Sequence, residues 1–298
     1  MTPITEVEGR RLPLSNLDKV LYLATGFTKG ELLHYYATTA EALLPHLHNR
    51  PLSFLRFPDG PDGQHFFAKN VPPGAPDWVK TAEVPRSDGV SRQVLVQDLA
   101  SLMWAANLVT ELHTPQWQVD APAQADRLVL DLDPGAPADI VQCCEVALWL
   151  RERLAEDGLD AYAKTSGSKG LHLLVPLVLV PSERASAYAK RLAQEAEAEL
   201  AGLVVHRMTR SLRPGKVFVD HSQNSAAKTT AAPYTLRARP EPTVSAPVTW
   251  EEVEACRDSG DARDLVFLAE DIAPRLQRYG DLLGPLNDAE RAGRLPSA

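Results

Sequence analysis

The sequence predicts an α+β fold, a mixed α/β core in which helices flank the sheets. Two observations carry this prediction. Apolar strands such as Leu128 to Asp133 and the run that begins at Leu171 are followed by long helical segments, at about 137–157 and 182–201. Strands and helices mix along the chain without strict alternation, so a purely doubly wound sheet is not expected.

Local signals predict the elements of the N-terminal third. The capping-box spacing of Thr28 and Glu31 predicts a helix that ends near Leu44. Residues 51–69 are typical of a strand pair, because turn residues separate two short runs of strand-forming residues. A surface loop is expected at 71–90, which is rich in proline and polar residues, and a helix near 98–111.

Similar signals continue along the chain. A strand is expected to end at Thr165, and the loop 166–170 separates it from the strand that begins at Leu171. A short strand is predicted from Val217 to Asp220. Thr249 and Glu252 form another capping-box pattern and predict a C-terminal helix.

Composition limits the class of protein. The 298 residues carry a formal charge of −8 and are 44% hydrophobic, which suffices for a large core, as one domain or as two lobes. The longest apolar run, Leu171 to Val180, is too short to span a bilayer. No signal-peptide pattern follows Met1 and the three cysteines lack CxxC spacing, so a reducing cytoplasm is expected. The acidic balance argues against a general nucleic-acid coat but is compatible with a local basic patch.

The most informative segment is Asp131-Leu132-Asp133. Side chains alternate along a strand, so the leucines at 128, 130 and 132 would enter the core, while Asp131 and Asp133 share the other face with Val129. Two carboxylates roughly 7 Å apart at the backbone can converge on Mg²⁺ or Mn²⁺, which in turn bind phosphates. The alternative is a solvated strand end before a turn at Pro134.

Two further features are chemically suggestive. The loop Ser166-Gly167-Ser168-Lys169-Gly170 precedes His172, and its glycines, hydroxyls and lysine suit an anion. A plain hairpin turn with a core histidine is the alternative. Asp220 ends a strand and would complete a three-carboxylate cradle for two cations about 3.5–4 Å apart, although an Asp that closes a strand is commonly a turn residue.

Three segments resemble, in this order, the three catalytic motifs of archaeo-eukaryotic primases. They are Asp131-Leu132-Asp133, the loop that leads to His172, and Val219-Asp220 with Gln223-Asn224. The resemblance is closer to one branch, the polymerase domain of bacterial ligase D, which acts in non-homologous end joining. It covers about residues 10–280 and is carried also by five segments: Asn16 to Tyr22, Thr28 to Glu31, Phe66 to Asn70, Pro233 to Arg237, and Val244 to Pro247. It implies an archaeo-eukaryotic primase fold with an RRM-like catalytic core, as a single primase-polymerase domain over residues 1–298.

The resemblance also implies roles for three groups of residues. Two Mn²⁺ or Mg²⁺ ions, and no zinc, would be held by Asp131, Asp133 and Asp220. The incoming nucleotide would be bound by His113, Ser166, Lys169, His172 and Arg237. A DNA 5′-phosphate would be bound by Asn16, Lys19 and Lys29, and the DNA strands by Arg56, Phe66, Phe67 and Arg213.

Each role has an ordinary alternative. Lys19 and Lys29 would be solvated lysines, His113 would end a helix, and Arg237 would form a surface ion pair. Adjacent strand residues face opposite ways, so one of the two phenylalanines would lie in the core.

Three positions depart from the family pattern. Leu23 stands where Pro is usual, His221 where an aromatic residue is usual, and Thr235 where Ser is usual. None is a metal ligand. No Lys-x-Asp-Gly ligase signature and no nuclease domain is found, so a stand-alone polymerase or an isolated domain is expected.

The implied function is nucleotidyl transfer in DNA repair. Nucleotides, preferably ribonucleotides, would be added to a primer 3′-hydroxyl at DNA gaps and double-strand-break ends. The expected partners are such DNA, nucleoside triphosphates, a Ku-type end-binding protein and a separate DNA ligase, in the bacterial cytoplasm at the nucleoid and without a membrane. Two other classes stay open: a DNA-end-bridging scaffold with little catalysis, and a two-metal phosphatase or nuclease.

Overall fold

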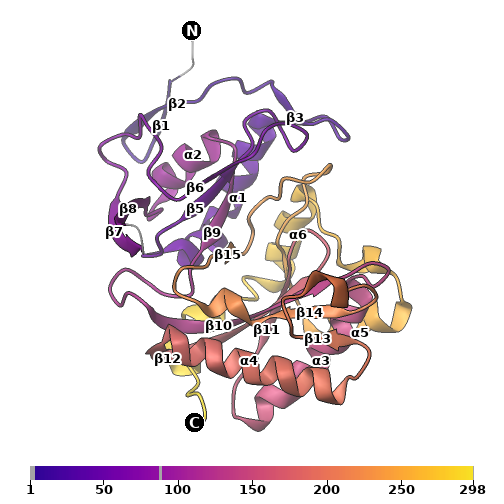
Figure 1. Ribbon diagram of the computed structural model, residues 1–298. Coiled ribbons are helices and arrows are strands. Elements are labelled where there is room, and N and C mark those ends of the chain that lie inside the picture. The colour runs from indigo at the N-terminus through magenta and orange to yellow at the C-terminus, as the bar shows by residue number, and fades with distance from the viewer. Residues whose placement is uncertain (1–3, 87–88, 298) are drawn as a thin grey trace. The chain divides into compact units, whose positions relative to one another are not determined.

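The computed structural model describes residues 4–86 and 89–297, which divide into two units built from segments distant in sequence (Figure 1). The first unit comprises Met1–Thr114, Thr230–Ser245 and Phe267–Gly280. The second comprises Pro115–Thr229, Ala246–Val266 and Asp281–Ala298. Each unit contains its own sheet and helices, which confirms the predicted mixed α/β class.

The first unit is built on an antiparallel sheet in the order β15-β9-β5-β6. Its strands are Thr230–Ala231, Thr110–Thr114, Ser53–Arg56 and Phe66–Ala68. The helices are α1 (Lys29–Leu47), α2 (Leu99–Asn107) and α6 (Ala269–Tyr279). Three two-stranded ribbons complete it: β1–β2 (Ile4–Val7, Arg10–Pro13), β3–β4 (Val20–Tyr22, Phe27–Thr28) and β7–β8 (Thr81–Arg86, Gly89–Val94).

The predicted start of α1 is confirmed by its cap. The backbone N–H of Glu31 donates to Oγ1 of Thr28 at 3.2 Å, and the backbone N–H of Thr28 donates to the Glu31 carboxylate at 2.7 Å. These bonds satisfy two of the donors that a helix start leaves unpaired. The helix continues through Pro45 to Leu47, three residues beyond the expected end.

Two expectations for the first unit are wrong in part. The segment predicted as a surface loop at 71–90 contains β7 and the start of β8. Pro85 is compatible with β7, because a two-stranded ribbon has free edges at which a missing N–H donor is tolerated. The helix expected near 98–111 ends at Asn107, and Val109 adopts a φ of +55°. Residues 110–113 pair with β5 instead, so His113 lies in a strand and not at a helix end.

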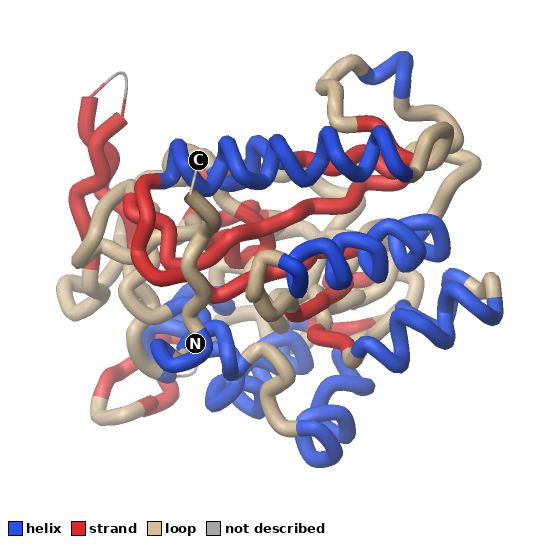
Figure 2. The backbone as a smooth tube through the Cα atoms, turned by 90° about the horizontal axis from the view of Figure 1, so that it is seen from below, coloured by secondary structure: helices blue, strands red, loops and turns tan. Residues whose placement is uncertain are grey.

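The second unit is built on a six-stranded sheet in the order β13-β14-β10-β12-β11-β16. Its strands are Val204–Val205, Val217–Asp220, Gln124–Pro134, Leu171–Pro181, Tyr162–Thr165 and Pro247–Val248. The helices α3 (Ile140–Glu156) and α4 (Ser182–Glu199) pack on β10 and β12, and α5 (Trp250–Ser259) packs on α3. Figure 2 shows long helices running alongside the strands. Short 3₁₀ turns occur at Arg210–Leu212 (η1), His221–Asn224 (η2), Ala262–Leu265 (η3), Gly284–Asn287 (η4) and Ala289–Arg291 (η5).

The predicted alternation along β10 is confirmed. The leucines at 128, 130 and 132 are fully buried. On the opposite face, Val129 and Leu174 pack against Leu283 and Leu286 of the C-terminal segment. Asp131 follows Val129 on this face and is only partly buried, so the apolar cover ends where the carboxylates begin.

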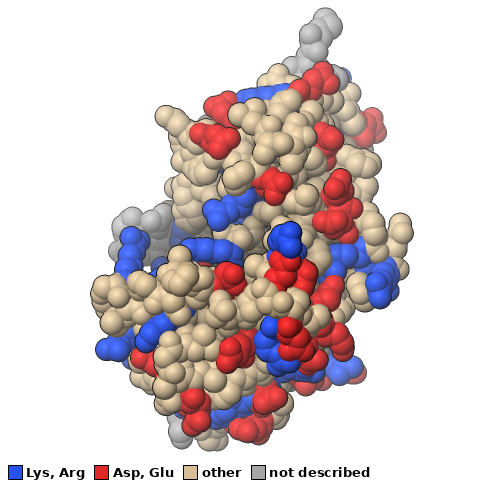
Figure 3. All heavy atoms as spheres, turned by 90° about the vertical axis from the view of Figure 1, so that its right-hand side faces the viewer, with Lys and Arg blue, Asp and Glu red and all other residues tan. Residues whose placement is uncertain are grey.

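The surface is mixed in charge, as the net charge suggests. On the face drawn in Figure 3, Lys and Arg side chains are interspersed with Asp and Glu and form no continuous basic band. Within the described residues, no helix combines the length and the apolar character needed to cross a membrane.

Candidate active site and candidate phosphate site

Strand register brings the three predicted carboxylates together in the second unit. Asp131 of β10 pairs with Asp220 of β14 on one side and with His172 of β12 on the other. Asp133 lies two residues further along β10, on the same face as Asp131. Nε2 of His172 lies 3.3 Å from Oδ1 of Asp131. Three segments that are distant in sequence therefore meet at one end of β10.

The electrostatics of this group favour a cation. Burial raises the pKa of Asp133 to about 6, and the charges of Asp131 and Asp220 add to the rise, while Lys169 and Arg213 lower it. Like-charged carboxylates that share a site disfavour ionisation, and a bound cation relieves that repulsion. Carboxylate oxygens are the ligands that Mg²⁺ and Mn²⁺ prefer. The donor chemistry therefore fits these ions, although no three His, Cys, Asp or Glu side chains in the described residues already form a metal-binding cluster.

The turn after β14 holds Asp220 in place. One Asp220 oxygen accepts hydrogen bonds from the backbone N–H and hydroxyl of Ser222, at 3.0 and 2.6 Å, and the other accepts from Nε2 of Gln223 at 2.8 Å. The fully buried Asn224 amide accepts from the N–H of Val129 at 2.9 Å and donates to its C=O at 2.8 Å. Asn224 thus fixes the turn to β10. Its place in the Gln223-Asn224 motif was the only sequence signal for this role.

The loop between β11 and β12 is a tight turn against β10. The hydroxyl of Ser166 accepts from the N–H groups of Ser168 and Gly170, at 3.2 and 3.1 Å. A Cβ at Gly170 would lie 2.0 Å from the C=O of Leu132, so only glycine fits there. Lys169 is close enough to Asp133 to lower its pKa. Ser166 therefore shapes the loop, and its contact with a triphosphate stays a prediction.

Arg213 belongs to the surroundings of the carboxylates. Its guanidinium carbon lies 3.7 Å from the ring centroid of Phe218, and its Nη2 donates to the C=O of Met208 at 3.0 Å. A Cβ at Gly135 would lie 2.2 Å from the C=O of Arg213, so the loop before β14 packs tightly on the end of β10. The charge of Arg213 lowers the pKa of Asp133.

The other two residues predicted to bind the nucleotide, His113 and Arg237, lie in the first unit, where both contact Glu111. Nε of Arg237 donates to Oε2 of Glu111 at 3.0 Å, and Nε2 of His113 lies 2.9 Å from the same oxygen. The N–H of Ala238 donates to Oε1 at 2.7 Å. Glu111 is 2% exposed, so the ion pair of Arg237 is buried and not a surface pair. Sequence reasoning missed Glu111, whose alternation with His113 on one strand was the available signal.

The substitution at Thr235 keeps the function of a hydroxyl. Oγ1 of Thr235 accepts from the N–H of Leu112 at 2.9 Å and lies 3.3 Å from the hydroxyl of Tyr36. The N–H of Leu236 donates to the same Tyr36 hydroxyl, and the hydroxyl of Tyr22 donates to the C=O of Arg237. Serine and threonine both supply this oxygen, which explains why the departure from the family pattern is tolerated.

Both predicted aromatic residues are exposed. Phe66 and Phe67 are 49% and 58% exposed, so the alternative in which one of them lies in the core does not hold, and their stacking on bases stays a prediction. Among the strands that the structure describes, β6 pairs with β5 alone and forms the edge of its sheet, and both of its faces carry accessible side chains. Phe67 lies on the face of His113, with ring centroids 6.3 Å apart, and Phe66 lies opposite Arg56 in the strand register.

The residues predicted to bind a DNA 5′-phosphate lie close together at the start of α1. The N–H of Lys19 donates to the C=O of Asn16, whose φ is +56°, and the N–H of Lys29 donates to the C=O of Lys19. The Lys19 ammonium donates to Asp59 at 2.6 Å. Lys29 is 6% exposed, so it is not a solvated surface lysine; burial and then the charge of Lys19 lower its pKa. Two ammonium groups beside a helix N-terminus suit an anion.

Comparisons with known proteins identify the family. The family model described as LigD, primase-polymerase domain, matches residues 28–283. A multifunctional non-homologous end joining protein LigD of Mycolicibacterium smegmatis is 43% identical over 290 residues, 96% of this chain and 37% of that protein. A multifunctional non-homologous end joining DNA repair protein LigD of Mycobacterium tuberculosis (strain ATCC 25618 / H37Rv) is 44% identical over 297 residues, 96% of this chain and 38% of that protein. The chain thus spans less than two fifths of these relatives.

A solved structure extends the likeness to the fold. The polymerase domain from Mycobacterium tuberculosis Ligase D in complex with DNA superposes with a TM-score of 0.88 at 43% sequence identity, covering 94% of this chain and 99% of that one. The family match includes parts of both units, the three carboxylates and the Glu111 cluster. The chain therefore belongs to the family of LigD primase-polymerase domains.

Proposed function

We propose that this domain is a metal-dependent nucleotidyltransferase that extends a primer 3′-hydroxyl at DNA gaps and double-strand-break ends during non-homologous end joining. The observation that carries the proposal is the strand register that unites Asp131, Asp133 and Asp220, with His172 beside Asp131. The names of the relatives, which are end-joining proteins, support the pathway. The solved relative in complex with DNA supports DNA as the substrate.

The residues of the second unit would divide the chemistry among them. Asp131, Asp133 and Asp220 would hold two Mg²⁺ or Mn²⁺ ions. Such ions, when bound, neutralise the triphosphate and lower the pKa of the attacking hydroxyl. Lys169 and His172 would bind phosphate oxygens by charge-assisted hydrogen bonds and orient the α-phosphate toward the primer end. Asn224 would keep Asp220 in register with Asp131.

Residues of the first unit would bind nucleotide and DNA. Glu111 aligns Arg237 and His113, whose proposed role is to contact the nucleotide. Exposed Phe66 and Phe67 would stack on bases, each stack being worth about 1–3 kcal/mol. Asn16, Lys19 and Lys29 would bind the 5′-phosphate at the far side of a gap. Arg56 and Arg213 would contact the strands.

The family resemblance supports finer parts of the proposal. These are a preference for ribonucleotides, the use of Mn²⁺, and cooperation with a Ku-type end-binding protein and with a DNA ligase activity at the bacterial nucleoid. Each is measurable separately from nucleotide addition itself.

Primer extension on a gapped duplex tests the proposal. The assay compares ribonucleotides with deoxynucleotides, Mg²⁺ with Mn²⁺, and a 5′-phosphate with a 5′-hydroxyl. We expect the wild-type protein to extend the primer and folded Asp131→Asn to bind the gap without extending it. Unchanged extension by Asp131→Asn would refute the assigned centre. Tight binding without extension by the wild type under every condition would favour a DNA-end-bridging scaffold.

A further inference from the structure

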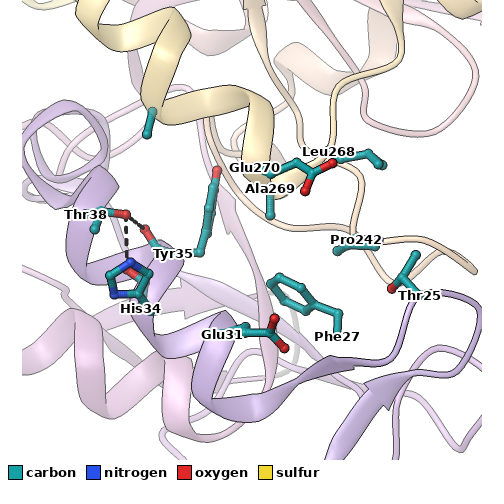
Figure 4. A pocket seen from close by; sticks show the side chains of 11 residues that line it. Thr25, Phe27, Glu31, His34, Tyr35, Thr38, Pro242, Leu268, Ala269 and Glu270 are labelled. Atoms are coloured by element: carbon teal, nitrogen blue, oxygen red, sulfur yellow. Dashed lines mark hydrogen bonds between the residues drawn. The ribbon is translucent and has the colours of Figure 1, made fainter.

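A pocket in the first unit has no part in the proposed chemistry. It has a volume of about 400 Å³ and lies between the first turns of α1 and α6 and the end of the β3–β4 ribbon (Figure 4). Its apolar wall is formed by Phe27, Tyr35, Pro242, Leu268, Ala269 and Ala273. Pockets of 300–1,000 Å³ are the size that binds small ligands or side chains, as a rough guide.

The charged groups of the pocket are mainly acidic. Glu31 and Glu270 line it together with the polar side chains of Thr25, His34 and Thr38, and neither Lys nor Arg is among the described lining residues. In the view of Figure 4, Glu31 lies on the α1 side and Glu270 on the α6 side, with the Phe27 ring between them. The hydroxyl of Tyr35 is already used, since it donates to the C=O of Tyr234 at 2.7 Å. The pocket therefore offers an apolar wall with two carboxylates and the imidazole of His34.

Both carboxylates are available to a partner. Hydrogen bonds from Thr28 lower the pKa of Glu31, so it stays ionised, and these bonds use only one of its two oxygens. Glu270 forms no hydrogen bond or ion pair with any residue that the structure describes, and it is exposed. Glu270 therefore brings an unpaired carboxylate and Glu31 one free carboxylate oxygen, and negative charge at the pocket favours Lys or Arg over nucleic-acid phosphates.

The edge of the pocket extends the apolar surface. Leu23, in the same ribbon turn as the lining residue Thr25, is 73% exposed. Ala273 of α6 is exposed as well. A ligand that fills the pocket would continue onto this edge, which suits a segment of a protein chain better than a small cation.

We propose that this pocket docks a short segment of a partner protein in which apolar side chains are flanked by Lys or Arg. An apolar side chain packs against Phe27, Ala269 and Ala273, and the flanking cations meet Glu31 and Glu270. This inference goes beyond the proposed catalytic function and does not depend on it.

The positions of the two acids have a second explanation, which the test must separate. An acidic residue in the first turn of a helix offsets the helix dipole, and both Glu31 and Glu270 occupy first turns. Glu251 occupies the same position in α5 that Glu270 has in α6, yet does not line the pocket. Glu251→Gln is therefore the matched control for Glu270→Gln.

The test titrates the full chain into fluorescein-labelled Arg-Leu-Phe-Leu-Lys and follows fluorescence anisotropy. We expect saturable binding that is weakened about threefold in Glu270→Gln, as for loss of one exposed ion pair. Binding should be lost in Ala273→Trp, which fills the pocket. Glu251→Gln and Ala155→Trp, at an exposed alanine of α3, should bind as the wild type does. Circular dichroism verifies that each variant is folded.

Several outcomes would overturn the proposal. They are the absence of saturable binding, equal binding by Ala273→Trp and Ala155→Trp, and equal binding of Glu-Leu-Phe-Leu-Glu. Benzylammonium binding as tightly as the peptide would assign the pocket to small cations. Saturable binding of a short labelled single-stranded oligonucleotide that is retained in Ala155→Trp and lost in Ala273→Trp would assign the pocket to nucleic acid.

Discussion

At the scale of single residues, Glu111 supports the functional side chains of the first unit. Burial raises the pKa of its carboxyl, but the hydrogen bond with His113 and the charge of Arg237 outweigh burial and hold that pKa at about 2. A folded-state pKa below the usual 4.5 means that the ionised group stabilises the fold at neutral pH. That stabilisation is lost as the pH falls through 4.5 toward 2.

Glu111→Gln tests this linkage. We expect its free energy of unfolding to fall by about 1–3 kcal/mol at pH 7, because Arg237 loses its buried counter-charge, and by less at pH 3. Urea denaturation at the two pH values measures the difference. The exposed control Glu251→Gln should lose little at either pH, and an equal loss for Glu111→Gln at both would contradict the assigned pKa.

Asp133, in contrast to Glu111, is expected to lower the stability of the metal-free protein while it serves nucleotide addition. Its carboxylate is held near Asp131 and Asp220, and burial with their charges raises its pKa. Asp133→Asn removes this repulsion without changing shape, so we expect the metal-free protein to be stabilised by about 1–3 kcal/mol. Nucleotide addition should fall by more than about 100-fold. Thermal unfolding in EDTA and primer extension measure the two effects; a destabilised Asp133→Asn protein would show that the carboxylates do not repel one another.

At the scale of elements, the active centre depends on how β10 meets its neighbours. Gly170 lets the loop before β12 touch the backbone of β10, where a Cβ would lie 2.0 Å from the C=O of Leu132. Gly170→Ala must move the loop, so we expect a loss of about 1–3 kcal/mol in stability and weaker nucleotide use. Gly284→Ala is the control, because its Cβ would lie 3.7 Å from Asp281. Equal nucleotide KM values in the two variants would contradict a role for this close contact.

The η2 turn provides a second test at this scale. Asn224→Ala leaves the buried N–H and C=O of Val129 without the amide that now bonds both. We expect a loss of about 2–4 kcal/mol from these two groups, together with lower activity of the folded fraction, because Asp220 shifts relative to Asp131. Thermal denaturation and primer extension of Asn224→Ala and the exposed control Ser225→Ala measure both effects. Full activity in folded Asn224→Ala would show that the turn does not position Asp220.

At the scale of the whole molecule, an acidic protein must bind DNA through focused sites. The net charge of −8 repels phosphates, and the described basic groups at the start of α1 are few. Binding should therefore be tighter to a gap with a 5′-phosphate than to one with a 5′-hydroxyl. The preference should decline as salt rises, since each phosphate contact releases counterions.

Lys19→Met/Lys29→Met tests the phosphate site without opening a cavity at buried Lys29. We expect the 5′-phosphate preference to vanish and the slope of log affinity against log salt to become shallower by about 2. Lys80→Met/Lys228→Met removes the same charge from exposed positions and should keep the preference. The assay is fluorescence anisotropy with gapped duplexes at several salt concentrations. An unchanged 5′-phosphate preference in Lys19→Met/Lys29→Met would show that both lysines have only a structural role.

Comparison of sequence with structure shows which features are local. The caps at Thr28 and Thr249 and the alternation of leucines along β10 were predicted correctly, because each depends on residues within one turn or one strand. The predicted ends of α1 and α2 were wrong by a few residues, because packing against other elements decides where a helix ends. The β7–β8 ribbon was missed because residues 71–90 are rich in proline and polar residues and have little strand character.

The sequence by itself determined the family, the mixed α/β class and the identity of the three carboxylates. Only the tertiary structure decided that Asp220 stands beside Asp131, that Glu111 joins His113 to Arg237, and that Phe66 and Phe67 are both exposed. The physical reason is range. Capping and strand alternation arise between neighbouring residues, whereas strand register, edge exposure and buried ion pairs arise between segments that are brought together only when the chain folds.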